Sequence, residues 1–539
     1  MKKIYIYLIL LLGIVSCTNF LDTYPYDEMS PETTWNDEDD AEAFVVGCYD
    51  NWVDGWTIPY MDCASDIGYN NFPWEGYLKI GNGTFTAAST GHSFYDYTCV
   101  RRCNTFMEHI GNIEFSDADT KADLIAQVRT IRAYQYFVMN FWYGGVAIIT
   151  NYNSADEAKV PRNSESEVKQ YVYNQLDSAL LDINEEPSAR GRIAKGTVLA
   201  IKMRSALYWG DYERSLSAAK AIVDLNQYEL DDNYTNLFTL DGQSSKEIIC
   251  PINYLATYDR LKIIGRMYNN EDGGWSSIVP TEHLIDMYEM NDGKTIEEST
   301  SYDPVHPFAN RDPRLAMTVL YPGMDWKFQN KNTVILNTLD ETVNGSTNNN
   351  YPTAASNSSK TSLSWAKYTT PSNQYDDVWN TSCSPILFRY AEVLLTLAET
   401  ENELYGPTDD AYDALDMIRK RVGMPEVDRT KYNTKSTLRM LIRRERCVEL
   451  AGEGLRRADI VRWTDENGDM LAKSLLNEEL TRITGTIDYN ESDPTMRAVI
   501  DTANREKIET RIFKDSNRYF PIPQTSIDNN PNLEQNEGY

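Results

Sequence analysis

Two segments of the chain combine flat aromatic rings with short hydrogen-bonding side chains. The first reads SDIGYNNFPWEGYLK at residues 65–79, and the second reads MYNNEDGGWSS at residues 267–277. A pyranose presents C–H bonds on one face and hydroxyl groups at its edge, so it pairs with aromatic faces and with amide or carboxylate groups. We interpret both segments as candidate glycan-binding loops. The candidate ligand residues are Asp66, Asn70, Asn71, Trp74, Tyr77, Tyr268, Trp275 and, as a third and weaker position, Trp365 beside Tyr368.

The alternative interpretation is that each of these tryptophans packs inside its own part of the fold, because Trp is highly buried on average. Gly273 and Gly274 favour the exposed alternative for Trp275, since a glycine pair lets a loop turn its indole outward. The aromatic residues His109, Trp142 and Trp209 lie on apolar helical stripes, and we assign them to packing.

Motifs for common catalytic chemistry are missing from the sequence. It has no GxSxG, HExxH, phosphate-binding or dinucleotide-binding motif, and its four histidines are not at metal-ligand spacing. We therefore expect no cofactor and no metal. A pair of catalytic carboxylates, as in a glycosidase, is an alternative that the sequence leaves open. With 81 Asp and Glu residues in the chain, any two of them are far more often solvated than catalytic. Asp465–Asp469 faintly resembles a calcium loop but lacks its full pattern, so a plain turn is favoured.

The N-terminus predicts export and a lipid anchor. Lys2 and Lys3 precede a twelve-residue apolar run, Ile4–Val15, which is too short to span a membrane and typical of a secretory signal. Ser16 directly before Cys17 resembles the bacterial lipoprotein processing site. The alternative is an ordinary signal peptide with Cys17 as an incidental thiol. We expect residues 1–16 to be the signal peptide and 17–34 the lipid anchor and tether.

The composition indicates a folded, acidic protein. The formal charge is −30 and the sequence is 41% hydrophobic, so the chain is not disordered. A nucleic-acid partner is excluded, because phosphate backbones bind clustered Lys and Arg. Tyr outnumbers Phe by 36 to 15, which suits wet contact surfaces better than a core.

The periodicity predicts a mainly α fold of tetratricopeptide-type helical hairpins. Apolar stripes run along 124–142, 199–223 and 387–418, and the last two contain a turn at 210–212 and at 405–407. Residues 240–384 are rich in Pro, Gly and polar runs, with short strands expected at 246–251 and 332–338. We predict one domain over 35–539, with a helical scaffold (35–239 and 385–463), a loop-rich insertion (240–384) and an irregular C-terminal part (464–539).

Two further clusters have structural interpretations. Cys99 and Cys103 lie four apart on an expected helix near His92, and we favour small core residues over a metal site because no second cysteine pair accompanies them. The segment LIRRERCVELAGEGLRRADIVRW, 441–463, interleaves acidic and basic residues at helical distances. This pattern predicts a self-neutralising structural network.

The same segment resembles the signature of the SusD/RagB lipoproteins of Bacteroidetes. Other stretches resemble the family in the same order along the chain. They are FLDTYPYDEMSPETTWNDEDDAEAFVVGCYD, Arg102-Cys103-Asn104, RAYQYFVMNFWYGGVAII, NRDPRL after a DGK turn, and Tyr519–Pro523 through NNPNLEQNEGY. The resemblance covers nearly the whole chain after the signal peptide.

The resemblance implies a non-enzymatic receptor of the outer membrane. Such proteins capture oligosaccharides, or peptides in some members, and pass them to a SusC-type TonB-dependent transporter. Family ligand residues tend to come from the loop before the Arg-x-x-Asn helix and from the insertion, where Trp74 and Trp275 lie. The chain departs from some surface lipoproteins because no acidic run follows Cys17, so cell-surface exposure rests on the family alone. A tethered glycoside hydrolase and a protein-binding tetratricopeptide adaptor are the competing hypotheses.

Overall fold

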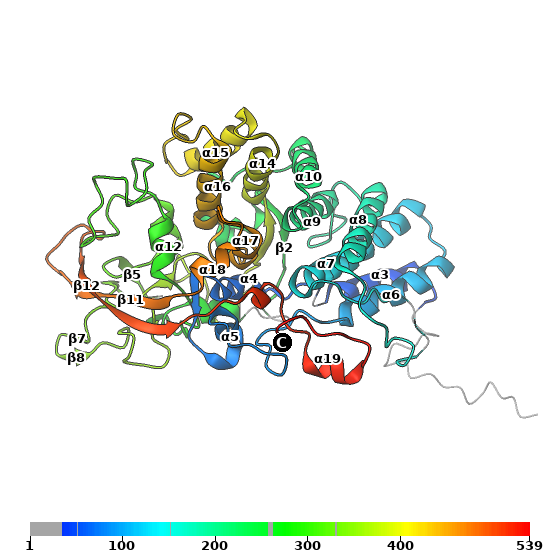
Figure 1. Ribbon diagram of the computed structural model, residues 1–539, viewed down its shortest axis with the longest axis horizontal. Coiled ribbons are helices and arrows are strands. Elements are labelled where there is room, and N and C mark those ends of the chain that lie inside the picture. Colours follow the sequence, from blue (N-terminus) through cyan, green and yellow to red (C-terminus); the bar gives the residue numbers. More distant parts are fainter. Residues whose placement is uncertain (1–34, 51, 151, 153, 257–261, 329–330) are drawn as a thin grey trace, which may run out of the picture.

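Long amphipathic helices form one side of the molecule, and loops with short strands form the other (Figure 1). The computed structural model describes residues 35–50, 52–150, 152, 154–256, 262–328 and 331–539. The predicted signal peptide, Cys17 and the tether lie outside these residues. Among the described helices, none combines the length and the apolar character needed to cross a bilayer.

The helices follow the expected periodicity, and the fold is mainly α as predicted. Their bounds are α3 Glu38–Tyr49, α4 Thr57–Tyr60, α5 Tyr77–Gly81, α6 Thr98–His109, α7 Ala118–Tyr143, α8 Glu165–Asp182, α9 Lys195–Tyr208, α10 Tyr212–Asp224, α11 Ile263–Met267, α12 Glu282–Met287, α13 Arg314–Thr318, α14 Tyr390–Tyr405, α15 Asp409–Arg421, α16 Lys435–Leu450, α17 Arg456–Arg462, α18 Leu471–Leu475 and α19 Gln524–Asn529.

Side-chain caps define where several of these helices begin. Asp37 accepts a hydrogen bond from the Asp40 amide at the start of α3, and Ser164 forms a capping box with Glu167 at the start of α8. The two predicted hairpins are α9–α10 and α14–α15, which turn at Gly210 and Gly406 with positive φ. Helix α10 packs on α14, so the hairpins are neighbours in space although the insertion separates them in sequence.

The strands are short and form two-stranded antiparallel sheets. Their bounds are β1 Gly68–Asn70, β2 Ile248–Pro251, β3 Ile278–Pro280, β4 Val319–Leu320, β5 Asp325–Lys327, β6 Thr333–Ile335, β7 Thr342–Val343, β8 Ser346–Thr347, β9 Ser364–Trp365, β10 Ile386–Arg389, β11 Glu479–Ile487 and β12 Ala498–Thr510. The pairs are β1–β3, β2–β10, β4–β9, β5–β6, β7–β8 and β11–β12. Strands β2 and β6 confirm the two predicted in the insertion.

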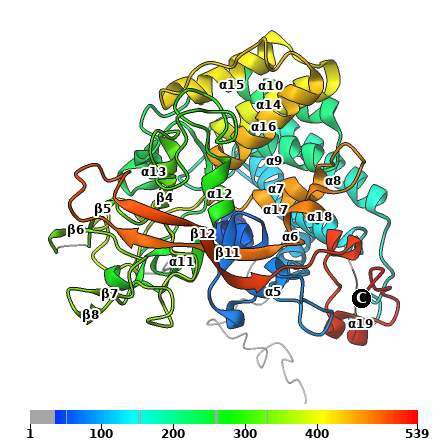
Figure 2. The same cartoon turned by 60° about the vertical axis from the view of Figure 1, so that its left-hand side comes forward.

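The prediction of an irregular C-terminal part is wrong for residues 479–487 and 498–510. They form the longest strand pair among the described residues, β11–β12, which runs across the molecule in Figure 2. Residues 501–507 of β12 are exposed and, except for Ala503, polar, so this strand has no apolar alternation that would predict it. Cross-strand ion pairs, Arg482–Glu506 and Lys507–Glu479, contribute to the pairing instead.

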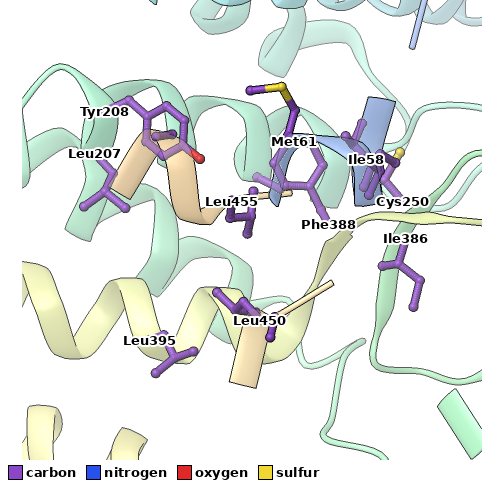
Figure 3. Close-up of a cluster of buried hydrophobic side chains, with 14 of the residues drawn as sticks. Ile58, Met61, Leu207, Tyr208, Cys250, Ile386, Phe388, Leu395, Leu450 and Leu455 are labelled. Atoms are coloured by element: carbon purple, nitrogen blue, oxygen red, sulfur yellow. The ribbon is translucent and has the colours of Figure 1, made fainter. Parts of the chain in front are cut away.

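The hydrophobic core joins segments that are far apart in the sequence. Figure 3 draws Ile58 and Met61 in one buried cluster with Leu207 of α9, Phe388 of β10 and Leu455 beside α17. All five side chains are buried. The core therefore attaches the N-terminal loops, the first hairpin and the arginine-rich segment to one another.

The arginine-rich segment contributes to a network of paired charges in the interior, as predicted. In this buried charge network, Arg389 contacts Glu247 and Glu449 at 2.7 Å each and Glu453 at 2.7 Å, and Arg314 contacts Glu449 at 3.1 Å. At its centre, four cations and four carboxylates have side chains that are at most 4% exposed, and ion pairs with Asp312 and Arg419, and through Arg419 with Glu289, extend the network. The central residues are Arg314, Lys367, Arg389, Arg421, Glu247, Glu445, Glu449 and Glu453.

Two arginines of the segment differ from this prediction, because they contact carbonyl oxygens and rings. Arg457 is buried, donates to the carbonyl oxygens of Ala64 and Asn517, and lies over the Phe513 ring. Burial lowers the pKa of Arg457 to about 10. Arg443 donates to the Thr464 carbonyl at 3.0 Å.

Cys99 and Cys103 are buried on α6, as expected for small core residues. The Cys99 thiol donates to the Cys48 carbonyl at 3.7 Å. Trp142, which we assigned to packing, is 7% exposed and stacks on Phe520 at 5.0 Å.

Candidate functional site

Trp74 and Trp275, the two tryptophans of the candidate loops, lie close together on the surface. Trp74 is 72% exposed and Trp275 is 41% exposed. Phe72 lies between them, with its ring stacked on Trp74 at 4.6 Å and edge-on to Trp275 at 6.1 Å. Ring faces from two distant segments therefore form one surface.

The loop that carries Trp74 is held by two asparagines that the sequence suggested as ligand residues. Both are buried. Asn70 donates to Glu75 at 2.6 Å and to the Ser277 carbonyl at 2.9 Å. Asn71 donates to the carbonyl oxygens of Ser276 and Ser358. The side-chain N–H groups of both asparagines therefore hold the two loops in place. The strand pair β1–β3 also joins these loops.

A tight turn positions Trp275. Gly273 has φ of 81°, and a Cβ on Gly274 would overlap the backbone of Tyr268. The Trp275 amide donates to the Gly265 carbonyl at 3.0 Å, and the Ser276 amide donates to the Tyr268 carbonyl at 2.9 Å. The glycine pair thus turns the indole outward in the way that the sequence suggested.

Three further residues complete this surface, and sequence analysis missed them. The guanidinium of Arg266 lies 4.8 Å from the Trp56 ring centre and 5.5 Å from that of Trp275. Trp379 packs 4.9 Å from Trp275 and donates through Nε1 to the Gly273 carbonyl at 3.1 Å. Trp56 follows Asp-Gly, and Trp379 lies between Asp-Asp-Val and Asn. That loop composition, similar to the two candidate segments, is the signal that could have identified them.

We call this surface the aromatic platform. It comprises Trp56, Phe72, Trp74, Trp275 and Trp379, with Arg266 among the rings. Arg266 forms an ion pair with Glu75 and donates to the Tyr60 hydroxyl at 3.0 Å. Because Glu75 is also bound by Asn70, both of its oxygens have partners. The platform offers flat apolar faces beside fixed polar groups, which suits stacking and hydrogen bonding rather than proton transfer.

Asp66, a suggested ligand residue, lies in the interior. It is 1% exposed and contacts Arg456 at 2.6 Å and His283 at 3.0 Å. Burial alone would raise the pKa of Asp66, but the two cationic neighbours outweigh burial and lower it. The carboxylate thus joins the N-terminal segment to α17.

Three suggested aromatic residues are also buried. Tyr77 lies on α5 and stacks between Tyr60 at 4.6 Å and His92 at 5.1 Å. Tyr268 is 1% exposed, and Trp365 is fully buried on β9. With almost no accessible surface, Asp66, Tyr77, Tyr268 and Trp365 lie outside the aromatic platform.

Comparison with known proteins identifies the relatives of this chain. Residues 230–539 match the model of the SusD family. The chain is 26% identical over 491 residues to the SusD-like protein P38 of Formosa agariphila, covering 84% of this chain and 89% of that protein. It is 22% identical over 597 residues to the starch-binding protein SusD of Bacteroides thetaiotaomicron, covering 98% and 96%. A SusD-like carbohydrate-binding protein of Bacteroides fragilis superposes with a TM-score of 0.80 at 26% identity, covering 93% of this chain and all of that one.

Proposed function

Because this chain belongs to the SusD family, we propose that it captures glycan oligosaccharides on the aromatic platform without cleaving them. One observation carries this proposal: Trp74 and Trp275, from segments far apart in the sequence, present ring faces to solvent side by side. The names of the starch-binding and carbohydrate-binding relatives support the ligand class. Arg266, which its ion pair with Glu75 holds in place, adds a guanidinium beside the rings.

The proposal includes where the protein acts. Lipid on Cys17 anchors the chain to the outer membrane with its body outside the cell, and a SusC-type TonB-dependent transporter receives the glycan. The N-terminal sequence and the family support this assignment. Affinity purification of the anchored protein from native outer membranes tests it, because the transporter should copurify. Purification without a transporter would contradict the delivery step.

A glycan array followed by calorimetry tests the binding function. We expect the mature chain to bind at least one glycan class, and chromatography should detect no shortened products. The double variant Trp74→Ala/Trp275→Ala should lose at least about 100-fold in affinity, because two aromatic contacts disappear. Tyr405→Ala is the matched control, since Tyr405 is 67% exposed at the end of α14, away from the platform.

Other results of these experiments would contradict glycan capture on the platform. Released products would support a hydrolase instead. Binding of peptides but not glycans would support a peptide receptor. Unchanged affinity in the double variant would remove the platform as the site.

A further inference from the structure

A hollow of about 460 Å³ lies between the β11–β12 hairpin and residues 338–362. We call it the hairpin pocket. It is lined by no residue of the aromatic platform. One wall carries Tyr351 and Ser362, and the other carries Arg482, Thr486 and Glu506. Its volume is in the range of natural small-molecule sites and exceeds what one sugar ring needs.

An irregularity in the hairpin forms one wall of the pocket. Ile483 pairs with Arg505, but Gly485 pairs with Ile500, so Thr484 alone opposes residues 501–504. A Cβ on Gly485 would overlap the Val499 carbonyl oxygen, so only glycine permits this approach of the strands. Such bulges occur next to functional sites because they redirect side chains.

The bulge is held in one conformation. The Thr484 hydroxyl donates to the Asn504 carbonyl at 3.0 Å, and the Arg505 guanidinium donates to the Asp501 carbonyl at 2.7 Å. Arg505 also pairs with Glu282 of α12 at 2.9 Å. The opposite wall is tied to the hairpin, because the Ile487 amide donates to Asp340 at 3.2 Å. A ligand would therefore meet a preorganised pocket.

The pocket combines a ring, an ion pair and hydroxyl groups. Arg482 forms an ion pair with Glu506, and its guanidinium lies 5.9 Å from the Tyr351 ring centre. The hydroxyls of Ser362 and Thr486 add donors and acceptors. Arg482 and Glu506 neutralise each other, and Asp501 adds one negative charge to the lining. Because the whole chain also carries −30, the pocket disfavours an anionic ligand and admits a neutral one. Ring faces beside neutral hydrogen-bonding groups match a sugar.

One chain segment borders both the pocket and the platform. Tyr351 lines the pocket, while Asn357 in the same segment donates to the Gly274 carbonyl at 3.3 Å, one residue before Trp275. We propose that the hairpin pocket is a second subsite, which binds one or two neutral pyranose units independently of the platform. This inference rests on the proposed glycan-binding function and adds a second contact to it.

Saturation-transfer NMR on the mature chain tests the inference. The probes are methyl glycosides of glucose, galactose, mannose and xylose at 10 mM. We expect at least one probe to bind the wild type, and Trp74→Ala/Trp275→Ala to keep at least half of its saturation transfer. Adding Tyr351→Ala to that double variant should reduce the remaining signal at least fivefold. If Tyr351→Ala lowers the melting temperature, Thr486→Trp takes its place in the test. This substitution fills the pocket from an exposed position and should reduce the signal by the same factor.

Several results would overturn the second subsite. They are no signal from any probe, loss of all signal in the platform double variant, or a signal that neither Tyr351→Ala nor Thr486→Trp changes. In each case, array binding of longer glycans by the wild type would leave the proposed function standing. Failure of the array itself would contradict the proposed function instead.

Discussion

The buried charge network and the aromatic platform place the same residue types in opposite settings. Arg389 is 1% exposed and binds three glutamates, whereas Arg266 lies half-buried between two indoles and binds one. The first arginine is enclosed by protein, and the second lies beside ring faces that solvent reaches. A dense cluster of charges is therefore no sign of a functional site, whereas exposed rings held by fixed polar groups are.

The two regions also differ in what their polar contacts join. The charge network connects the insertion, strand β10 and α16, since Glu247, Arg389 and Glu449 come from those three parts. The polar contacts around the platform hold three loops, through Asn71 and Arg266, without covering the rings. Changes in the network should alter stability, and changes in the platform should alter binding.

The largest expected effect comes from Arg389→Met. The substitution leaves Glu247, Glu449 and Glu453 buried without their shared cation, so the free energy of unfolding should fall by about 3–5 kcal/mol. Urea denaturation measures this loss, and the affinity of the remaining folded protein should not change. Arg429→Met is the control, because Arg429 is 47% exposed and its nearest partners, Asp413 and Asp409, are exposed, so its loss should leave the unfolding midpoint almost unchanged. Equal effects of the two variants would remove the distinction between the regions.

A smaller effect concerns pH and Asp62. This carboxylate is fully buried and accepts the Gly452 amide at 2.7 Å. Burial raises its pKa to about 7, although the amides of Gly454, Gly452 and Arg456 oppose the shift. The folded state then binds a proton that the unfolded state has released, so stability falls as pH rises from 4 to 7.

Asp62→Asn isolates this effect, because Asn resembles the protonated acid. Between pH 5 and 7 the wild type should lose up to about 2–3 kcal/mol relative to the variant, at about 1.4 kcal/mol per pH unit. Urea denaturation across this range measures the difference. A difference that stays constant would show that Asp62 keeps its ordinary pKa. Glycan affinity of the folded protein should not follow the same curve.

Gly265→Ala should have a moderate effect confined to the platform. A Cβ at this position would lie 2.6 Å from Cδ2 of Trp379, so the indole must shift and its packing on Trp275 must change. Affinity should fall about three- to tenfold, as measured by calorimetry. Gly47→Ala is the control on α3, where a Cβ meets nothing within 4 Å, and it should stabilise the helix by about 0.5–1 kcal/mol without changing affinity. Equal affinities for wild type and Gly265→Ala would exclude Trp379 from the ligand surface.

Sequence reasoning predicted the helical scaffold well, because its signals are local. The stripe on α7 and the glycine turns of both hairpins depend on neighbours within a few positions. The β11–β12 hairpin was missed because its exposed strand is polar, and its pairing depends on contacts between residues that are distant along the chain.

The candidate site was predicted only in part, because burial depends on residues far along the chain. Trp74 and Tyr77 lie three positions apart in a loop of suitable composition, but Tyr77 is covered by Tyr60 and His92. Asp66 is enclosed by Arg456 of the arginine-rich segment. Composition shows which loops can bind a sugar. It cannot show which ring another segment covers.

The smallest effect concerns the size of the ring at position 74. Trp74 is 72% exposed and contacts Phe72, so Trp74→Phe removes part of a contact face without leaving a cavity. Affinity should fall about two- to threefold, stability should not change, and Trp74→Ala should lose about tenfold. Calorimetry with the glycan selected by the array measures the series. If the wild type, Trp74→Phe and Trp74→Ala have equal affinity for the glycan, Trp74 does not contact the ligand. The ligand surface is then limited to Trp275 and its neighbours. A graded loss across the series at constant melting temperature would show that an exposed ring acts through the area it offers to the sugar.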